Sequence, residues 1–260
     1  MTFFFSLMNS IQLTAIENFP LVEPNDDLVD IIIDCTASSD VSIEDGDILV
    51  IAQKIISKSE NRYVDLNSVK VDIDTNELAI KINKDPRLLQ LIKNESNKII
   101  STDNNVVIVE HKLGYVNINA GIDVSNIPNN KDQVLLLPEN PTISSDKICN
   151  ELSKKIQKNI STIISDSMTR PYRAGVINFA LASTNVPSLI DITNQKDIYG
   201  NSFKCTEVAI ADELASAAGL IMGQGNEQKP VIIVKGFNKR NSSEFNASNL
   251  VVAEENDLYR

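Results

Sequence analysis

The sequence predicts a mixed α+β fold, because strand-like and helix-like segments alternate along its 260 residues. Several strand candidates are continuous apolar runs, as expected of strands that are covered on both faces. The segments between them repeat apolar residues at helical spacing, and no repeat recurs at the period of a solenoid. We therefore expect mixed sheets with helices packed against them, in a chain long enough to bury a substantial core.

Strands are predicted where apolar residues run together between polar segments. These segments are IQLTAI (11–16), DILVIAQ (47–53), NVVIVEH (105–111), QVLLLP (133–138), STIISD (161–166), VINFALAS (176–183) and PVIIVKG (230–236). The polar segments 123–133 and 238–249 are predicted to be loops, and the second to be a mobile approach to the C-terminus.

Four helices are predicted between these strands. They span residues 26–38, 75–93, 144–159 and 206–223, the second broken by a proline. In the third, apolar residues recur at every fourth position, and Ser144 or Ser145 is a suitable N-cap. In the fourth, Thr206 is the expected cap, and Gly219 and Gly223 fit a tight contact with a sheet and a helix end.

The composition excludes several classes of protein. A net charge of -11 argues against a general attraction to nucleic-acid backbones. His111 is the only histidine, which excludes a metal site with several histidine ligands. The cysteines Cys35, Cys149 and Cys205 are widely spaced, so we expect buried, reduced thiols and a reducing cytoplasm. Because no segment resembles a membrane span or an export signal, we expect a cytoplasmic protein with no membrane or nucleic-acid partner.

We expect one folded unit over residues 11–260, with a division into two subdomains left open. Its polar segments are too short to be secure domain linkers. Residues 1–10 are interpreted as an N-terminal extension, with Met8 as an alternative start.

Two clusters of polar residues in the first half of the chain suggest binding chemistry. In QKIISKSENR, Lys54, Lys58 and Arg62 recur at four-residue spacing, so on a helix they would share one face and could grip a triphosphate. A solvated basic edge is the alternative. In NINAGIDVSN, oxygen-bearing side chains surround a turn glycine, which suits Mg²⁺ or Mn²⁺ but is also typical of an Asx-turn. They belong to Asn119, Asp123, Ser125 and Asn126.

The segment ISDSMTRPYRAG combines an acid, hydroxyls and two arginines. Asp166 stands at the end of an apolar run, where carboxylates of active sites commonly emerge from α/β sheets. Ser167 and Thr169 add hydroxyl oxygens, and Arg170 and Arg173 can bind phosphate or carboxylate. The alternative is a surface loop whose arginines pair with nearby acids.

The segment MGQGNEQKP joins the last predicted helix to the last predicted strand. Its two glycines permit a close backbone approach, and Gln224, Asn226 and Lys229 add amides and a cation. It matches neither a Walker A loop nor G-x-G-x-x-G, and an ordinary turn is the alternative. Together, the four clusters supply the residue types of a metal and nucleotide site.

Taken in order, these motifs resemble the coenzyme F420-0:L-glutamate ligase family. The resemblance spans residues 11–260 and is carried by FPLV, GDILVIAQKIISKSENR, GYVNINAGIDVSN, LLPENP, ISDSMTRPYRAG, DIYGNSFKCTEVAIADELASAAGLIMG and EENDLYR. It implies the unusual α+β gamma-glutamyl ligase fold, in an intertwined homodimer. It also implies a GTP-dependent enzyme that adds L-glutamate to the deazaflavin F420-0, with two Mn²⁺ or Mg²⁺ sites and K⁺.

The resemblance also implies roles for individual residues. The implied nucleotide-binding residues are Phe19, Pro20, Leu21, Val22, Ser57, Lys58, Arg62, Asn126, Met222, Gly223, Gln224, Gly225, Asn226, Glu227, Gln228 and Lys229. The implied metal ligands are Asp123, Asp166 and Ser167, with Gln224 at the second metal. Arg170 and Arg173 are the implied catalytic residues, which would orient phosphate or the carboxylates of substrates.

The chain departs from the family pattern in the segment around Asp166. Ser167 replaces threonine and keeps the hydroxyl, and Tyr172 replaces tryptophan and keeps an aromatic ring. Thr169 replaces glycine, and we expect it to restrict the turn that aims Asp166. The segment 176–189 lacks glycines often found in the family, so the acceptor pocket is expected to differ.

The implied reaction has two steps. The acceptor carboxylate attacks the γ-phosphate of GTP to give an acyl phosphate and GDP, and the amine of glutamate then displaces phosphate. No side chain stands out as a general base, and positioning with electrostatics could suffice. Two alternatives stay open: an amide ligase with a different acceptor or amino acid, and a nucleotide-binding regulator without catalysis.

Overall fold

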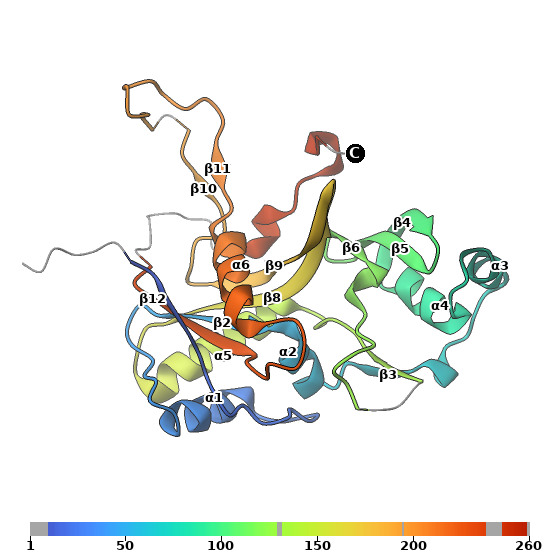
Figure 1. Cartoon of the computed structure of the whole chain (residues 1–260), viewed down its shortest axis with the longest axis horizontal. Helices are drawn as coiled ribbons and strands as arrows, with labels where there is room; N and C mark the ends of the chain where they lie inside the picture. The colour runs from blue at the N-terminus through green and yellow to red at the C-terminus, as the bar shows by residue number, and fades with distance from the viewer. Residues whose placement is uncertain (1–9, 129–131, 194, 238–245, 259–260) are drawn as a thin grey trace, which may run out of the picture.

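The computed structural model describes residues 10–128, 132–193, 195–237 and 246–258. Within these residues, a mixed sheet of five strands forms the centre of the molecule, in the order β1-β12-β2-β8-β9 (Figure 1). β2 and β8 pair in parallel, whereas the other neighbours in this sheet are antiparallel. The strands are β1 (Gln12–Ala15), β12 (Val231–Lys235), β2 (Ile48–Ala52), β8 (Ser161–Arg170) and β9 (Arg173–Thr184).

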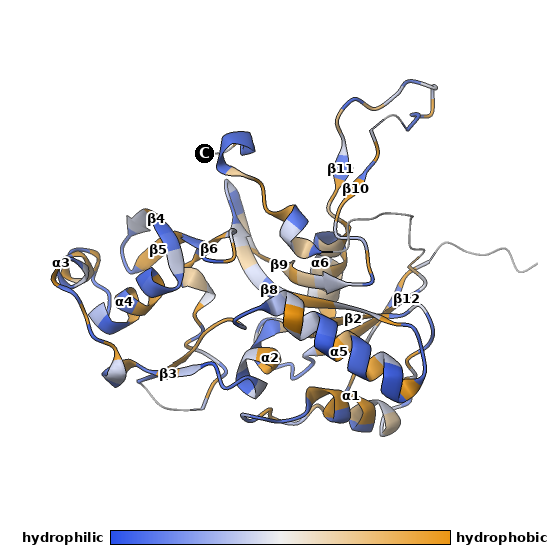
Figure 2. Cartoon of the chain, turned by 180° about the vertical axis from the view of Figure 1, so that it is seen from behind, coloured by the Kyte–Doolittle hydropathy of each residue, from blue (hydrophilic) through white to orange (hydrophobic). Residues whose placement is uncertain are grey.

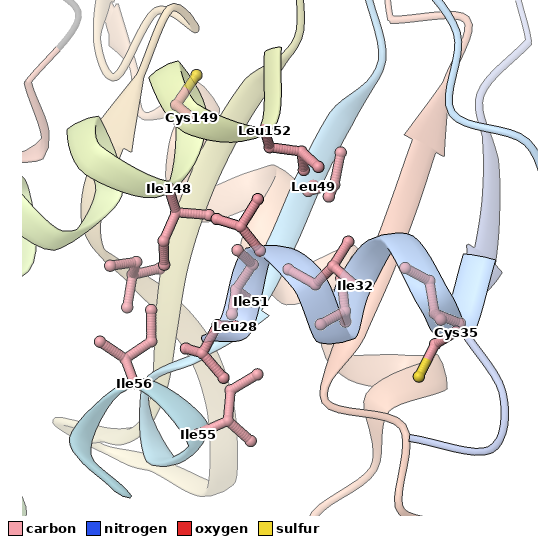
Figure 3. Packing of buried hydrophobic residues seen from close by; sticks show 14 of the residues in the cluster. Leu28, Ile32, Cys35, Leu49, Ile51, Ile55, Ile56, Ile148, Cys149 and Leu152 are labelled. Carbon is pink, nitrogen blue, oxygen red and sulfur yellow. The ribbon is translucent and has the colours of Figure 1, made fainter. Parts of the chain in front are cut away.

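Helices cover both faces of the central sheet. One face carries α1 (Leu28–Ala37), α2 (Gln53–Ser59) and α5 (Pro141–Ile156), and the other carries α6 (Ile210–Met222). Figure 3 shows Ile32 of α1 and Leu152 of α5 packed with Leu49 of β2. Successive residues of β2 belong to the cores on opposite faces, which explains its continuous apolar run. Figure 2 accordingly colours β2 and β12 as hydrophobic.

A smaller lobe with its own core lies beside the central sheet (Figure 1). Its three-stranded antiparallel sheet packs against two short helices, the second of which begins at Pro86. The lobe comprises β4 (Ser96–Asp103), β5 (Val106–His111), β6 (Val116–Ile118), α3 (Ile73–Ile82) and α4 (Pro86–Asn94). The antiparallel pair β3 (Tyr63–Asp65) and β7 (Gln133–Leu135) connects it to the rest of the chain.

Short elements complete the described chain. An arm built on β10 (Ile190–Asp191) and β11 (Glu207–Val208) extends away from the central sheet (Figure 1). The 3-10 helices are η1 (Leu66–Ser68), η2 (Asn119–Gly121), η3 (Ala247–Leu250) and η4 (Glu254–Asn256). No helix in the described ranges is both long and apolar enough to cross a membrane.

The predicted α+β class and all seven predicted strands are confirmed, within a few residues at their ends. The break in the second predicted helix is also confirmed, since α3 ends at Ile82 and α4 begins at Pro86. Sequence reasoning missed β3, β4, β6, β10 and β11. Most of the polar segment 238–249, whose mobility was expected, lies outside the described residues, as does nearly all of the N-terminal extension.

Both predicted helix caps are wrong. α5 begins earlier than expected, because Asn140 accepts the backbone N–H of Ile143 and Pro141 occupies the first turn. α6 begins after the short strand β11, and its N-cap residue is Ala209, without a capping side chain. The roles expected of the two glycines are confirmed: a side chain at Gly219 would clash with β9, and Gly223 caps the helix with a φ of 76°.

The three cysteines differ in exposure. Cys35 and Cys149 are buried, as expected, and burial raises the pKa of the Cys35 thiol. Cys205 is exposed on the arm, which contradicts the expectation that all three would be buried. All three are free of disulfide bonds.

The segment 164–175 is a β-hairpin, rather than a loop that starts after Asp166. β8 continues to Arg170, the turn lies at Pro171 and Tyr172, and β9 begins at Arg173. The left-handed backbone angles of this region belong to Tyr172, with a φ of 57°, and to Gly175, with a φ of 83°. Thr169 lies in β8 at a register shift between Met168 and Arg170, two residues before the turn formed by Pro171 and Tyr172.

We predict that Thr169→Gly lowers the free energy of unfolding by about 0.5–1 kcal/mol, because glycine is entropically costly within a strand. Urea unfolding followed by circular dichroism measures this change. Thr169→Val is the matched control, since it keeps the β-branched side chain and should leave stability nearly unchanged. A gain of stability with glycine would show that Thr169 is strained.

Candidate active site

The candidate site lies where β2 ends beside β8. Parallel pairing between these strands runs up to Ala52 and Ser165, and β2 then passes directly into α2. β8 continues without β2 as a neighbour, so Asp166 and Ser167 are the first residues beyond the paired region. The carboxyl end of parallel strands is where α/β sheets commonly bind ligands.

Asp166 faces the α2 side of the sheet. It is opposite Phe179 on β9. Side chains two positions apart on a strand share a face, and Ile164, two positions before Asp166, belongs to the core that contains α2. Asp123 reaches the same place from the loop after η2. Two acidic residues 43 positions apart in the sequence therefore lie close together.

The first turn of α2 holds Asp123 in place. Gln53 Nε2 donates to Asp123 Oδ2 at 2.8 Å, and Lys54 Nζ lies 2.6 Å from Asp123 Oδ1. Lys54 Nζ also donates to the backbone oxygen of Ser125 at 3.2 Å. Ser57, one of the implied nucleotide residues, donates to Gln53 Oε1 at 2.8 Å and is fully buried. Ser57 therefore supports the orientation of Gln53 from inside the fold.

Burial and like charge raise the pKa of Asp166 to about 7. The larger cause is burial, and the second is the negative charge of Asp123. The backbone N–H of Ser167 and the side chains of Lys54 and Gln53 oppose this rise only in part. The carboxyl of Asp166 therefore binds its proton more tightly than a carboxyl in water does.

Lys58 is a second cation beside the acids. Burial lowers its pKa, the neighbouring Lys54 lowers it further, and Glu23 and Asp123 act in the opposite direction. Lys54 and Lys58 share a face of α2, as predicted. Arg62 does not belong to that face, because α2 ends at Ser59; Arg62 Nε instead donates to the backbone oxygen of Leu137 at 2.9 Å.

Ser167 faces the other side of the hairpin, because successive residues of a strand point in opposite directions. It is opposite Asn178 on β9, whose side chain contacts the end of α6. Gln224 Nε2 donates to Asn178 Oδ1 at 2.6 Å. The implied ligands therefore form two groups, Asp123 with Asp166 and Ser167 with Gln224, on opposite sides of the hairpin.

The loop 222–229 connects these two groups. Asn126 Nδ2 donates to the backbone oxygen of Gly225 at 2.9 Å, which ties this loop to the loop that carries Asp123. Glu227 folds back within the loop and accepts the backbone N–H of Gly225 at 2.8 Å. Lys229 pairs with Glu17 at 3.1 Å, near the start of the FPLV segment. Gln224 and its next four neighbours along the chain are exposed.

The FPLV segment divides between core and surface. Phe19 and Val22 are buried in the core that contains α1, whereas Pro20 and Leu21 are exposed, Leu21 by 76%. The two buried side chains anchor the segment, and the exposed pair is available to a ligand.

The two arginines lie at the far end of the hairpin. Arg170 and Arg173 are opposite each other in the strand register. Arg170 lies four positions after Asp166, which is about 13 Å along the strand. Arg173 is exposed, and Arg170 is half-buried, with an Nη1 that lacks a hydrogen-bond partner among the described residues. Both can therefore bind only parts of a substrate that extend along the hairpin.

Several residues at the site were missed by sequence reasoning. Gln53 could have been found from its four-residue spacing to Ser57 at the start of a helix. Asn178 gave no signal, because it lies within an apolar strand. Tyr115 is a third: its ring meets Phe179 edge to face at 5.2 Å, and its hydroxyl is buried without a partner in the described chain. Asn119 has a structural role, since it accepts the backbone N–H of Val107 at 3.2 Å.

The residues present fit a divalent cation such as Mg²⁺ or Mn²⁺. Over the described ranges, no three His, Cys, Asp or Glu side chains cluster as a complete protein ligand set. The donors are instead two carboxylates, a hydroxyl and an amide, which are hard oxygen ligands that leave positions for water and phosphate. The ammonium of Lys54, 2.6 Å from Asp123 Oδ1, shows that this position attracts positive charge.

The fold and the site define an α+β protein with an acidic, oxygen-rich site and flanking cations at the end of a mixed sheet. Residues 17–236 match the model of the family described as F420-0:Gamma-glutamyl ligase. The chain belongs to this family of ligases.

Relatives of similar length support this assignment. The protein named Coenzyme F420:L-glutamate ligase of Methanocaldococcus jannaschii is 42% identical over 75% of this chain and 78% of its own length. Its namesake in Methanothermobacter thermautotrophicus is 36% identical over 87% of this chain and 89% of its own length. That of Archaeoglobus fulgidus is 33% identical over 96% of both chains.

We predict that Asp166→Asn stabilises the metal-free protein at pH 8 but not at pH 4. The folded-state pKa of about 7 lies above the ordinary 3.8, so ionisation of Asp166 lowers stability as the pH rises between these values. Asparagine cannot ionise, and the expected gain at pH 8 is on the order of 1–3 kcal/mol. Urea unfolding with a chelator measures it, and an equal effect at both pH values would contradict the raised pKa.

Proposed function

We propose that this protein is a GTP-dependent ligase that joins L-glutamate to coenzyme F420-0 through a γ-glutamyl amide bond. The main support is that Asp123, Asp166 and the loop 222–229 lie close together at the end of β2, in a chain of this ligase family. The relatives bear the name Coenzyme F420:L-glutamate ligase, which supports F420-0 and glutamate as the substrates.

The nucleotide is proposed to lie between α2 and the loop 222–229. Lys58 on α2 would face the phosphates, the exposed residues Pro20 and Leu21 would contact the rest of the nucleotide, and Asn126 ties the loop 222–229 to the loop that carries Asp123. Lys58 is half-buried, so its charge acts on a phosphate with little screening by water. Arg62 would support nucleotide binding indirectly, because its Nε donates to the backbone oxygen of Leu137 and so holds the loop after α2 in place.

Asp123 with Asp166, and Ser167 with Gln224, are the groups that would hold two divalent cations, Mn²⁺ or Mg²⁺; a K⁺ ion is a further proposed cofactor. Bound divalent cations would neutralise the phosphate charge that develops during transfer. The chain's own contribution is to hold the two carboxylates close together, by means of Gln53 and the strand pairing of β8.

The proposed reaction transfers a phosphoryl group and then forms an amide. A carboxylate oxygen of the acceptor attacks the γ-phosphorus of GTP, the bond to the β-phosphate oxygen breaks, and GDP leaves. The amine of glutamate then attacks the acyl carbon, phosphate leaves, and the amine loses a proton. Arg170 and Arg173 would bind anionic parts of the acceptor or of glutamate along the hairpin, since they lie too far from Asp166 to share its phosphate.

The direct test mixes the purified protein with GTP, Mn²⁺, L-glutamate and F420-0. We expect GDP, phosphate and a glutamylated product that is heavier by one or more residues in mass spectrometry. Absence of both GDP and product would overturn the proposal. GTP hydrolysis that responds to another acceptor would instead show a related amide ligase, and binding of GTP without turnover would show a regulator.

Asp166→Asn is predicted to abolish turnover, because it removes one of the two carboxylates while keeping the side-chain shape. Asp34→Asn on the exposed side of α1 is the matched control and should keep full activity. Circular dichroism should show that both variants remain folded. Retained turnover in Asp166→Asn would remove Asp166 from the reaction.

We also propose that the protein acts in the cytoplasm as a homodimer, in which the arm packs on the second copy. At the end of the arm, Ile198 is 91% exposed and Tyr199 is 84% exposed. Neighbouring exposed apolar side chains on a projecting element are typical of a contact surface. The buried thiols of Cys35 and Cys149, which are free of disulfides, are compatible with a reducing compartment.

Replacing Ile198 and Tyr199 together with serine is predicted to convert a dimer into a monomer in light scattering. Leu220→Ser is the control, because Leu220 is 88% exposed on α6 but lies outside the arm. A monomeric parent protein, or a double variant that stays dimeric, would contradict this role of the arm.

A further inference from the structure

Asn178 links the β8–β9 hairpin to the end of α6. It is 4% exposed and lies opposite Ser167 in the strand register. Its Oδ1 accepts Gln224 Nε2 at 2.6 Å, and its Nδ2 donates to Met222 Sδ at 3.7 Å. A buried amide is stable only when its polar atoms are satisfied, so these two bonds fix the orientation of the side chain.

One face of α6 is shaped to receive this asparagine. Ser216 Oγ donates to the backbone oxygen of Asn178 at 2.7 Å. At Gly219, a Cβ atom would lie only 2.8 Å from Asn178 Cγ, so glycine is required for the close approach. Ser216, Gly219 and Met222 recur at three-residue spacing and therefore line one side of the helix. Three residues on one side of α6 therefore contact Asn178.

This contact determines which end of the Gln224 amide is left for a ligand. Its Nε2 is committed to Asn178, whereas its Oε1 accepts no hydrogen bond from any residue the structure describes. A hard cation binds the amide oxygen and never the amide nitrogen. The bond to Asn178 therefore presents the correct atom, on the same side of the hairpin as Ser167.

We propose that Asn178 is a positioning residue that orients Gln224 as a ligand of the cation on the Ser167 side of the hairpin. This inference rests on the proposed function, since it assumes that a divalent cation binds there with the nucleotide. Partners of metal ligands typically contribute 10- to 100-fold to metal affinity.

The test is a titration of Mn²⁺ into the full-length protein with saturating GTP, followed by the electron paramagnetic resonance signal of free Mn²⁺. Asn178→Leu conserves volume and removes the acceptor, and we expect it to weaken the affinity of one Mn²⁺ site by 10- to 100-fold. Asn178→Asp keeps an oxygen that can accept from Gln224 and should stay within about threefold of the parent. Ser216→Ala is the control, because it removes a contact to the same residue's backbone without touching its side chain.

A double-mutant cycle separates positioning from a general effect on packing. In a Gln224→Ala background, Asn178→Leu should cause no further loss of Mn²⁺ affinity, because the oriented group is already absent. Asn178→Ala gives the same comparison if the leucine variant fails to fold. Equal Mn²⁺ affinity in the parent and in the Asn178→Leu or Asn178→Ala variant, or an additional loss in the Gln224→Ala background, would overturn the inference. A parent protein that binds no Mn²⁺ with GTP would instead refute the proposed function itself.

Discussion

The early end of the pairing between β2 and β8 is the constraint on which the site depends. β2 becomes α2 immediately after Ala52, while β8 runs on to Arg170 with β9 as its partner. The unpaired edge of β8 then faces α2 on one side and the end of α6 on the other. Asp166 and Ser167 are the first residues past this point, and because successive strand residues alternate, Asp166 points to the α2 side and Ser167 to the α6 side. A longer β2 would pair with this edge and leave no room for a ligand.

Repulsion between the two carboxylates of the site lowers the stability of the fold. Asp123 and Asp166 lie close together and are only partly exposed, and the contacts of Lys54 and Gln53 offset their mutual repulsion only in part. Natural proteins retain such unfavourable pairs chiefly where function requires them, because substitutions that relieve the repulsion are easily found. The strongly raised pKa of Asp166 therefore supports a functional role for this carboxylate more than a structural one.

The sequence predicts the central sheet and the acidic cluster well, because long apolar strands and oxygen-rich turns are local signals. It fails where tertiary contacts override local pattern. The segment from Asp166 to Arg170 looks like a loop, yet it forms a strand because β9 pairs with it on both sides of a register shift at Thr169. Asn178 looks like a defect in an apolar strand, and only the packing of α6 against it reveals its contacts. Likewise, nothing local shows that Arg62 lies beyond the end of α2.

Anomalous diffraction from crystals grown with Mn²⁺ and GTP would locate the cations relative to the end of β2. We expect one manganese peak beside the carboxylates of Asp123 and Asp166, and a second beside Ser167 and the amide oxygen of Gln224, with the phosphates of GTP near both. Manganese bound elsewhere, or nucleotide bound away from the end of β2, would contradict the assignment of this place as the active site.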